Sequence, residues 1–104
     1  IPGEVKRFDE SLLSCKTSLP HMGWNDIIPK INPLFANISD PRFYFLHSYY
    51  FLPASAEHVL SEAEYGERFA AAVCREHVIG VQFHPEKSHH WGIRLLQNFA
   101  EFQP

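Results

Sequence analysis

The side chains in this sequence best suited to chemistry are His84 and Glu86, which are separated only by Pro85. In extended backbone, residues i and i+2 project from the same side of the chain, so the imidazole and the carboxylate can face one pocket. Pro85 fixes its own φ and has no backbone N–H, which stiffens the segment. An imidazole oriented by a carboxylate is the arrangement that a general base beside a nucleophile requires. The alternative interpretation is a surface pair or a structural hydrogen bond.

His89 and His90 follow shortly after and raise the question of a zinc site. On extended backbone, the side chains of adjacent residues point to opposite faces. No thiolate supports the two histidines, and their spacing matches none of the usual zinc patterns. We therefore predict no metal site.

The elements that must position these residues are mostly short strands. Residues 43–52 are rich in aromatic side chains, which predicts a buried strand. Three further strands are predicted at 59–63, 69–74 and 78–83, and their close spacing indicates antiparallel pairing. Residues 70–72 are all alanine and are equally compatible with a helix.

The first forty residues contain more turn signals. A short strand is predicted near Val5, and a second over 19–28 that ends in a shaped loop around Trp24. Asn32 is typical of a helix cap and is followed by proline, which predicts a short helix over 32–38.

An amphipathic helix is predicted from Ser88 onward. Ser88 is a plausible N-cap, and the chain ends in proline just beyond the pattern. Apolar side chains recur every three or four residues and are predicted to form the core face of this helix: Trp91, Leu95, Phe99 and Phe102.

Composition favours one soluble domain. The chain has 104 residues, of which 45% are hydrophobic and 14% aromatic, which is enough for a single core. The formal net charge of −3 gives no sign of nucleic-acid binding. All apolar runs are far shorter than the roughly 20 residues that a membrane helix needs.

The cysteines and the first residues bear on location and completeness. Only two cysteines occur, without CxxC spacing and without a secretory segment, which predicts a reduced, cytoplasmic environment. The sequence opens at Ile1 with no initiator Met and a turn-like Pro-Gly, which suggests that sequence is missing upstream.

Three motifs carry a family resemblance. Residues 81–88, VQFHPEKS, followed by Gly92, resemble the C-terminal signature of the class I, triad-type glutamine amidotransferases. Residues 19–25, LPHMGWN, and 43–49, FYFLHSY, narrow the resemblance to the glutaminase subunits of imidazole glycerol phosphate synthases. The resemblance covers nearly the whole chain and implies a flavodoxin-like α/β domain, of which residues 1–104 would be the C-terminal part, mostly strands plus a final helix.

The resemblance also implies roles for single residues. In that family, the residue matching His84 is the general base, and the residue matching Glu86 orients it. Ser48 and Tyr49 match residues that help to hold the glutamine substrate, and Lys87 matches the lysine at the interface with the synthase subunit. No metal or organic cofactor is implied.

Trp24 has two interpretations, a core residue or a residue that faces the partner. Tryptophan is enriched in interface cores, and a loop is a poor place to bury an indole, so we predict a partner-facing role for Trp24. His21 has the same two interpretations. For Tyr44 we predict packing in the core.

The family's nucleophile is a cysteine in a Gly-x-Cys-x-Gly elbow, a strained turn between a strand and a helix. Neither Cys15 nor Cys74 lies in such a motif, so both are predicted to be structural. The elbow and the backbone oxyanion strand belong to the N-terminal half of the family. The chain by itself is therefore expected to be inactive, and the whole protein to be an enzyme.

The activity implied is glutamine hydrolysis. The missing thiolate would attack glutamine to give a thioester and ammonia, with His84 shuttling the proton. The ammonia would pass to a cyclase subunit or domain in histidine biosynthesis, the two forming a heterodimer if the chains are separate. One alternative is another class I amidotransferase, serving GMP, anthranilate or CTP synthesis, although the PHMGWN segment disfavours it. Another is a non-catalytic module that docks a partner.

Overall fold

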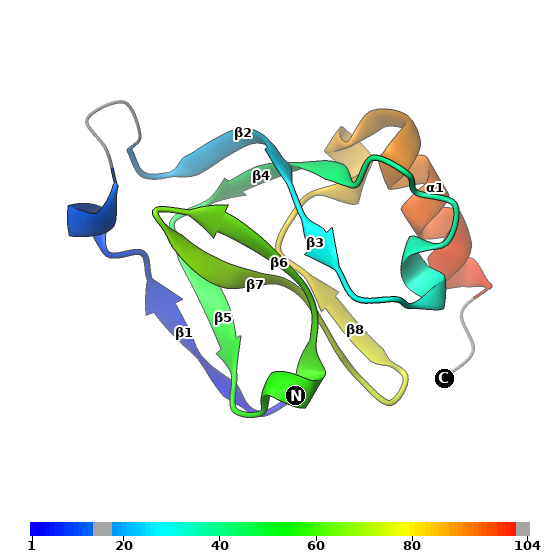
Figure 1. The fold of residues 1–104 in the computed structure, drawn as a ribbon, viewed down its shortest axis with the longest axis horizontal. Helices are drawn as coiled ribbons and strands as arrows, with labels where there is room; N and C mark the ends of the chain where they lie inside the picture. The colour runs from blue at the N-terminus through cyan, green and yellow to red at the C-terminus, as the bar shows by residue number, and fades with distance from the viewer. Residues whose placement is uncertain (14–17, 102–104) are drawn as a thin grey trace.

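The protein is described by a computed structural model that covers residues 1–13 and 18–101. Its strands form three sheets, and every strand pair in these two ranges is antiparallel. The one α-helix of the described residues, α1 (His89–Ala100), lies at the end of the molecule opposite β1 (Gly3–Arg7), as Figure 1 shows. The prediction of a strand-rich chain with a C-terminal helix is confirmed.

Two of the sheets are two-stranded ribbons. The first pairs β1 with β5 (Tyr49–Pro53), and the second pairs β2 (His21–Asp26) with β4 (Arg42–His47). The prediction of one strand over 43–52 is wrong. The strand β4 ends before Ser48, and after Ser48 the chain continues as β5 in the other ribbon. Ser48 is therefore a corner between two sheets.

The predicted loop around Trp24 is also wrong. Trp24 lies in the middle of β2, where it pairs with Tyr44 of β4. Gly23 beside it has a φ of +124°, a conformation that glycine adopts without a steric penalty. The strand therefore accommodates Gly23 without a break.

The third sheet has four strands in the order β3-β6-β7-β8. Their bounds confirm the three predicted antiparallel strands and assign the alanine run to a strand: β3 (Ile28–Pro29), β6 (Val59–Tyr65), β7 (Glu67–Arg75) and β8 (Val78–Val81). Gly66 turns the chain between β6 and β7 with a φ of +76°.

In the described part of the chain, four short 3-10 turns lie between the longer elements: η1 (Glu10–Leu12), η2 (Pro33–Phe35), η3 (Ala56–His58) and η4 (Pro85–Lys87). At η2, the Asn32 side chain accepts a hydrogen bond from the Leu34 amide at 2.9 Å, which confirms Asn32 as the cap. The element is a single turn and shorter than the predicted helix.

Aromatic side chains from β4 form the centre of the core. Phe43 and Phe45 are both fully buried, because alternate residues of a strand face the same side. The ring of Phe83 stacks on Phe43 at a centroid distance of 4.3 Å. Burying one such side chain stabilises the fold by about 1.5–3 kcal/mol, and Phe83 lies next to His84, so this core directly supports the candidate base.

The core face of α1 differs from the predicted one. Gly92, Leu95 and Asn98 are buried, Trp91 packs partly against the core, and Phe99 is 52% exposed. Asn98 donates to the carbonyl oxygens of two residues at η2, at 2.9 and 2.8 Å. Phe102, also assigned to the stripe, lies outside the described residues.

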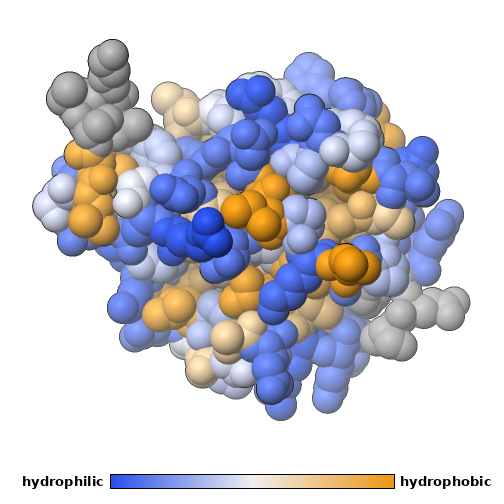
Figure 2. Space-filling view, viewed as in Figure 1, coloured by the Kyte–Doolittle hydropathy of each residue, from blue (hydrophilic) through white to orange (hydrophobic). Residues whose placement is uncertain are grey.

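The surface carries separate apolar areas among polar ones, as the face in Figure 2 shows. Among the exposed large apolar side chains are Met22, Trp24 and Leu46 on the β2–β4 ribbon, Ile93, Leu96 and Phe99 on α1, and Ile31. Across residues 1–13 and 18–101, no helix is long and apolar enough to cross a membrane.

Candidate functional site

The centre of the site is a hydrogen bond between His84 and Glu86. The His84 Nδ1 and Glu86 Oε1 atoms are 2.7 Å apart. The predicted contact is present, but the predicted extended backbone is wrong: His84 is extended, whereas Glu86 lies in the η4 turn. Pro85 begins that turn, so the turn brings the carboxylate to the ring.

The hydrogen bond fixes the tautomer of His84. An ionised carboxylate only accepts, so Nδ1 must carry the proton, and Nε2 keeps its lone pair to act as a base. The pKa of Glu86 is lowered by a hydrogen bond from its own backbone amide and then by the His84 ring. Glu86 is therefore ionised at neutral pH and stabilises an imidazolium when His84 takes up a proton.

Three hydrogen bonds, one between backbone groups and two through the Ser88 hydroxyl, tie His84 to β4. The His84 amide donates to the Tyr44 carbonyl at 2.8 Å. The Ser88 hydroxyl donates to the His84 carbonyl at 2.7 Å and accepts from the Tyr44 amide at 3.0 Å. Ser88 is 1% exposed and lies at the N-cap position of α1 as predicted, but its side chain makes no capping bond to the helix. Its hydroxyl instead bridges the candidate base to the sheet.

The junction between η4 and α1 is tight. His89 has a φ of +50°, an uncommon conformation for a residue with a side chain, and it turns the chain sharply into the helix. Gly92 then passes close to η4: a Cβ atom there would lie 1.9 Å from the carbonyl oxygen of Pro85. The first turn of the helix can press against the candidate site only because residue 92 is glycine.

Lys87 and Trp24 meet at the ring of Tyr44. The Lys87 Nζ lies 5.9 Å from the centroid of that ring, within the range of a cation–π contact. Trp24 packs on the same ring edge to face, with a centroid distance of 6.1 Å, and remains 41% exposed. Tyr44 is only half-buried, so it is not the core residue that we predicted. Lys87 reaches this ring from the last position of the η4 turn.

Ser48 and Tyr49 lie at the far end of β4 from this ring. Ser48 is half-buried, and its carbonyl accepts from the Phe8 amide at 3.2 Å. Tyr49 is exposed, and its carbonyl accepts from the His47 ring at 2.8 Å. Among the described residues, no hydrogen bond joins Ser48 or Tyr49 to His84.

A second pair of histidines lies on the β2–β4 ribbon. His21 Nδ1 and His47 Nε2 are 2.9 Å apart, and His21 is only 3% exposed. Burial, followed by the neighbouring His47, lowers the pKa of His21 to about 4. The pKa of His47 is also lowered, chiefly by burial, with a smaller effect of charge on His84. Both rings are therefore neutral at pH 7.

The lowered pKa of His21 predicts that the free energy of unfolding decreases as the pH falls. The unfolded chain binds a proton at the usual His21 pKa of 6.5, whereas the folded chain binds it only near 4. Between these values the unfolded state binds more protons, so the free energy of unfolding falls by about 1 kcal/mol per pH unit. Urea unfolding at pH 7, 6 and 5 measures this slope. His21→Asn is the control and is expected to flatten it; equal slopes with and without His21 would contradict the assignment.

The geometry of Cys74 does not suit a nucleophile. Cys74 lies on β7, where its Sγ contacts the Glu76 carbonyl oxygen at 3.6 Å, and burial raises the pKa of its thiol. A raised pKa keeps the thiol protonated and poorly reactive. Cys15 lies outside the described residues.

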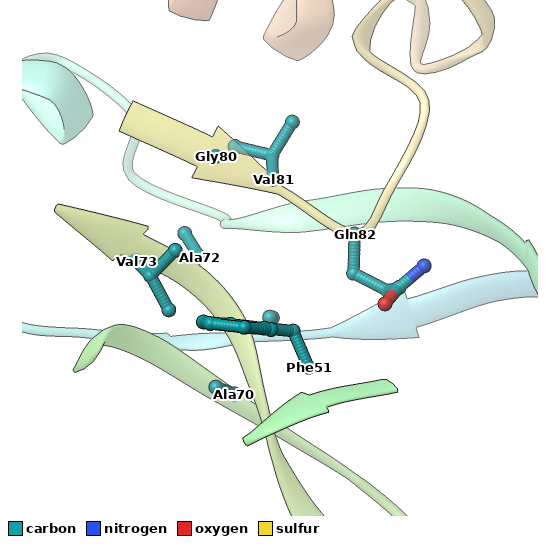
Figure 3. A pocket seen from close by; sticks show the side chains of 8 residues that line it. Phe51, Ala70, Ala72, Val73, Gly80, Val81 and Gln82 are labelled. Carbon is teal, nitrogen blue, oxygen red and sulfur yellow. The ribbon is translucent and has the colours of Figure 1, made fainter. Parts of the chain in front are cut away.

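The apolar hollow in Figure 3 is a different feature from the His84 site. It measures about 160 Å³, and Phe51 lines it together with residues from β7 and β8. Its walls include Val73 and Val81, and Gln82 contributes the only polar side chain. With no titratable group in its lining, the hollow offers no acid–base chemistry. In the parts of the chain that the structure describes, no group of three His, Cys, Asp or Glu residues could hold a metal ion.

Sequence reasoning missed several residues that build the site. Tyr44 alternates with the buried Phe43 and Phe45, and this alternation was the signal that its ring faces away from the core. Ser88 and Gly92 act through contacts between η4 and α1, and His47 through a partner on another strand. No local pattern reveals those contacts.

Comparisons with known proteins agree on one family. A family model for class-I glutamine amidotransferases matches residues 5–101. The chain is 48% identical over 85 residues to imidazole glycerol phosphate synthase subunit HisH 2 of Pseudomonas aeruginosa, covering 80% of this chain and 42% of that protein. It is 47% identical over 105 residues to subunit HisH of Neisseria meningitidis serogroup A, covering 96% of this chain and 50% of that protein.

A third relative extends over the whole chain. Subunit HisH of Aromatoleum aromaticum is 43% identical over 110 residues, covering 100% of this chain and 52% of that protein. The chain thus spans about half the length of the curated relatives that it matches.

Proposed function

Because the chain belongs to the class-I glutamine amidotransferase family, we propose that the protein containing it hydrolyses glutamine and delivers the ammonia to a cyclase partner of imidazole glycerol phosphate synthase in histidine biosynthesis. The single observation that carries the proposal is the 2.7 Å hydrogen bond from His84 Nδ1 to Glu86 Oε1, which leaves Nε2 free to act as a base. The relatives named HisH, at 43–48% identity, support the choice of synthase. The strand-rich fold with one C-terminal helix is consistent with a flavodoxin-like amidotransferase domain, of which residues 1–104 would be the C-terminal part.

The proposed reaction proceeds in two steps. His84 Nε2 takes the proton of the family's cysteine, and the thiolate attacks the side-chain amide carbon of glutamine. The C–N bond breaks, the imidazolium returns the proton to the leaving nitrogen, and ammonia departs from a glutamyl thioester. Water, activated by the same imidazole, then releases glutamate and regenerates the thiol. Glu86 stabilises the imidazolium in both steps.

The proposal assigns substrate binding to Ser48 and Tyr49. They lie at the corner where β4, the strand that anchors His84, gives way to β5, and the Tyr49 side chain there is exposed. No metal or organic cofactor takes part. Two cysteines without CxxC spacing support a reduced, cytoplasmic location.

Glutamate release by the complete protein, with and without its cyclase partner, tests the proposal. The complete protein is expected to release glutamate from glutamine and to support glutamine-dependent ring formation by the cyclase. The 104-residue chain is the matched control and is expected to release none, because its sequence holds no Gly-x-Cys-x-Gly elbow. If the complete protein binds the cyclase but releases no glutamate, it is a docking module and the proposal is wrong.

We further propose that Trp24 and Lys87 face the cyclase. Both contact the Tyr44 ring on the side of the β2–β4 ribbon away from the core. Met22 and Leu46, paired across the same ribbon, are 63% and 39% exposed and extend the apolar surface. A flat apolar face with an exposed indole and a cation is typical of the anchors in protein interfaces.

Trp24→Ala is expected to weaken binding of the cyclase by about 30-fold, the effect of losing an interface anchor worth about 2 kcal/mol. Lys87→Ala is expected to reduce the stimulation of glutaminase by the cyclase's ligand, because its ammonium would pair with a partner carboxylate beside the site. Titration calorimetry and glutaminase assays measure the two effects. Ile31→Ala, which truncates a fully exposed apolar side chain elsewhere, is the control. Unchanged affinity and unchanged stimulation would leave both residues as structural.

A further inference from the structure

Four groups on the β2–β4 ribbon and the following corner form one chain of hydrogen bonds. The chain runs from the Asn25 side chain through the rings of His21 and His47 to the Tyr49 carbonyl. Asn25 Nδ2 lies 3.3 Å from His21 Nε2, His21 Nδ1 lies 2.9 Å from His47 Nε2, and His47 Nδ1 lies 2.8 Å from the Tyr49 oxygen. The histidines occupy directly opposed positions on β2 and β4. The catalytic role proposed for His84 uses none of these contacts.

The direction of this chain follows from its Tyr49 end. A carbonyl oxygen only accepts, so His47 must carry its proton on Nδ1. A neutral imidazole has one N–H, so His47 Nε2 must accept, and His21 must donate to it from Nδ1. His21 Nε2 is then an acceptor, which requires an N–H from Asn25.

The Asn25 end gives the same direction independently. The Asn25 amide group is oriented by two backbone neighbours: its Nδ2 donates to the Glu64 carbonyl at 2.9 Å, and its Oδ1 accepts from the Asp26 amide at 2.8 Å. Turning the amide over would oppose oxygen to oxygen and N–H to N–H. Asn25 therefore presents N–H to His21, as the other end requires.

The packing around the chain holds both rings in place. The His21 ring is stacked between Phe45, at 4.7 Å, and Tyr65, at 4.1 Å, with interplanar angles of 18° and 19°. The His47 ring contacts Phe8 and Phe69, each at a centroid distance of 5.2 Å. Rings confined in this way cannot turn to exchange donor and acceptor atoms without disturbing the core.

We propose that His21 and His47 are positioning residues for glutamine binding: their directed hydrogen-bond chain fixes the backbone of the Ser48–Tyr49 corner from the buried side. The inference rests on the proposed function, because it takes Ser48 and Tyr49 as the substrate-binding corner. The corner leaves β4 and enters a different sheet, so β4 pairing does not hold it beyond His47. On the other side of the corner, Tyr49 pairs with Arg7 of β1, and the Ser48 carbonyl accepts from the Phe8 amide. The His47 ring adds a side-chain restraint by binding the Tyr49 carbonyl directly.

Two amide substitutions at His47 separate positioning from packing. In His47→Asn, the amide nitrogen takes the place of Nδ1 and can still donate to Tyr49. In His47→Gln, the amide reaches the place of Nε2, so the contact to His21 is kept and the contact to Tyr49 is lost. Both variants remove an imidazole and add a polar amide, so each serves as the control for the other.

In the complete protein with its cyclase partner, His47→Gln is expected to raise the KM for glutamine about tenfold, the effect of one lost hydrogen bond. The kcat should change less than about twofold, since the triad is intact, and His47→Asn should hold the KM within about threefold of the wild type. Equal KM values for the two variants, or a loss confined to thermal stability, would overturn the inference. If the wild type itself released no glutamate, the proposed function would be wrong and this inference would fall with it.

The hydrogen-bond chain itself is tested without a variant. Long-range ¹H–¹⁵N correlation spectra of the wild-type complete protein at pH 7 report which ring nitrogen carries the proton. Both His21 and His47 are expected to be neutral with the proton on Nδ1. A proton on Nε2 of either ring, or a charged ring, would break the directed chain and overturn the inference whatever the kinetic results.

Discussion

Replacing His84 with alanine in the complete protein is expected to lower glutamine-dependent turnover by about 100-fold or more, as for loss of a general base. The structure gives the reason: Glu86 holds the His84 proton on Nδ1, so Nε2 is the one site at which the imidazole can take up a proton. Without it, neither the thiol nor the water is activated. Glutamate release and ring formation by the cyclase measure the effect.

Ammonia supplied from solution is the control for this substitution. The cyclase reaction with added ammonia is expected to be unchanged in His84→Ala, because that reaction does not use the triad. Glu86→Gln should be milder than His84→Ala, since it keeps the base and removes only its charge support. An equal loss with glutamine and with ammonia would mean that His84 acts on partner binding or folding instead.

Gly92→Ala is expected to lower the free energy of unfolding by about 3 kcal/mol or more, at the upper end of the cost of overpacking. The added Cβ would lie 1.9 Å from the Pro85 carbonyl oxygen, a backbone atom that cannot rotate away. The higher helix propensity of alanine returns only about 1 kcal/mol. Relief of the clash must move α1 or η4, so the His84–Glu86 contact should also be disturbed.

Gly80→Ala is the matched control for that substitution. A Cβ at Gly80, on β8, would meet Val73 at 3.4 Å, an ordinary contact. Urea unfolding of the two variants compares their free energies, and glutaminase assays at a temperature where both are folded compare their sites. Similar stability of the two variants would show that α1 is not held against Pro85 as the structure has it.

The strands were more predictable than the breaks between them. The close spacing of the predicted strands at 59–63, 69–74 and 78–83 was enough for the sheet, because hairpins are local. The break at Ser48 was not predicted, since aromatic residues occupy both faces around it. The buried positions are odd-numbered before Ser48, at Phe43 and Phe45, and even-numbered after it, at Tyr50. Tyr49 is exposed but also aromatic, so the sequence does not reveal this shift in the alternation.

The helix shows a second limit of local patterns. Phe99 satisfies the apolar period of α1 but is exposed, whereas the polar Asn98 is buried because its amide binds two carbonyl oxygens at η2. That contact joins segments more than 60 residues apart in the sequence, as the separation of 64 between Asn98 and Leu34 shows. The apolar periodicity of the helix alone therefore could not predict that Asn98 is buried.

The candidate site was predictable in its residues and not in its support. The short spacing of His84 and Glu86 was enough to predict their contact, although a 3-10 turn makes it in place of an extended strand. The hydroxyl of Ser88 and the missing side chain of Gly92 hold that turn in place. Their roles depend on how two consecutive elements pack, which residue types alone do not specify.

The attachment of the site to β4 has an evolutionary consequence. His84 and Ser88 bind only the main-chain amide and carbonyl of Tyr44, and every amino acid except proline offers both groups. The Tyr44 side chain takes no part in this attachment and instead contacts Trp24 and Lys87. Selection can therefore exchange the residue at this position, and with it the surface proposed to dock the cyclase, while the attachment of the His84–Glu86 pair stays unchanged.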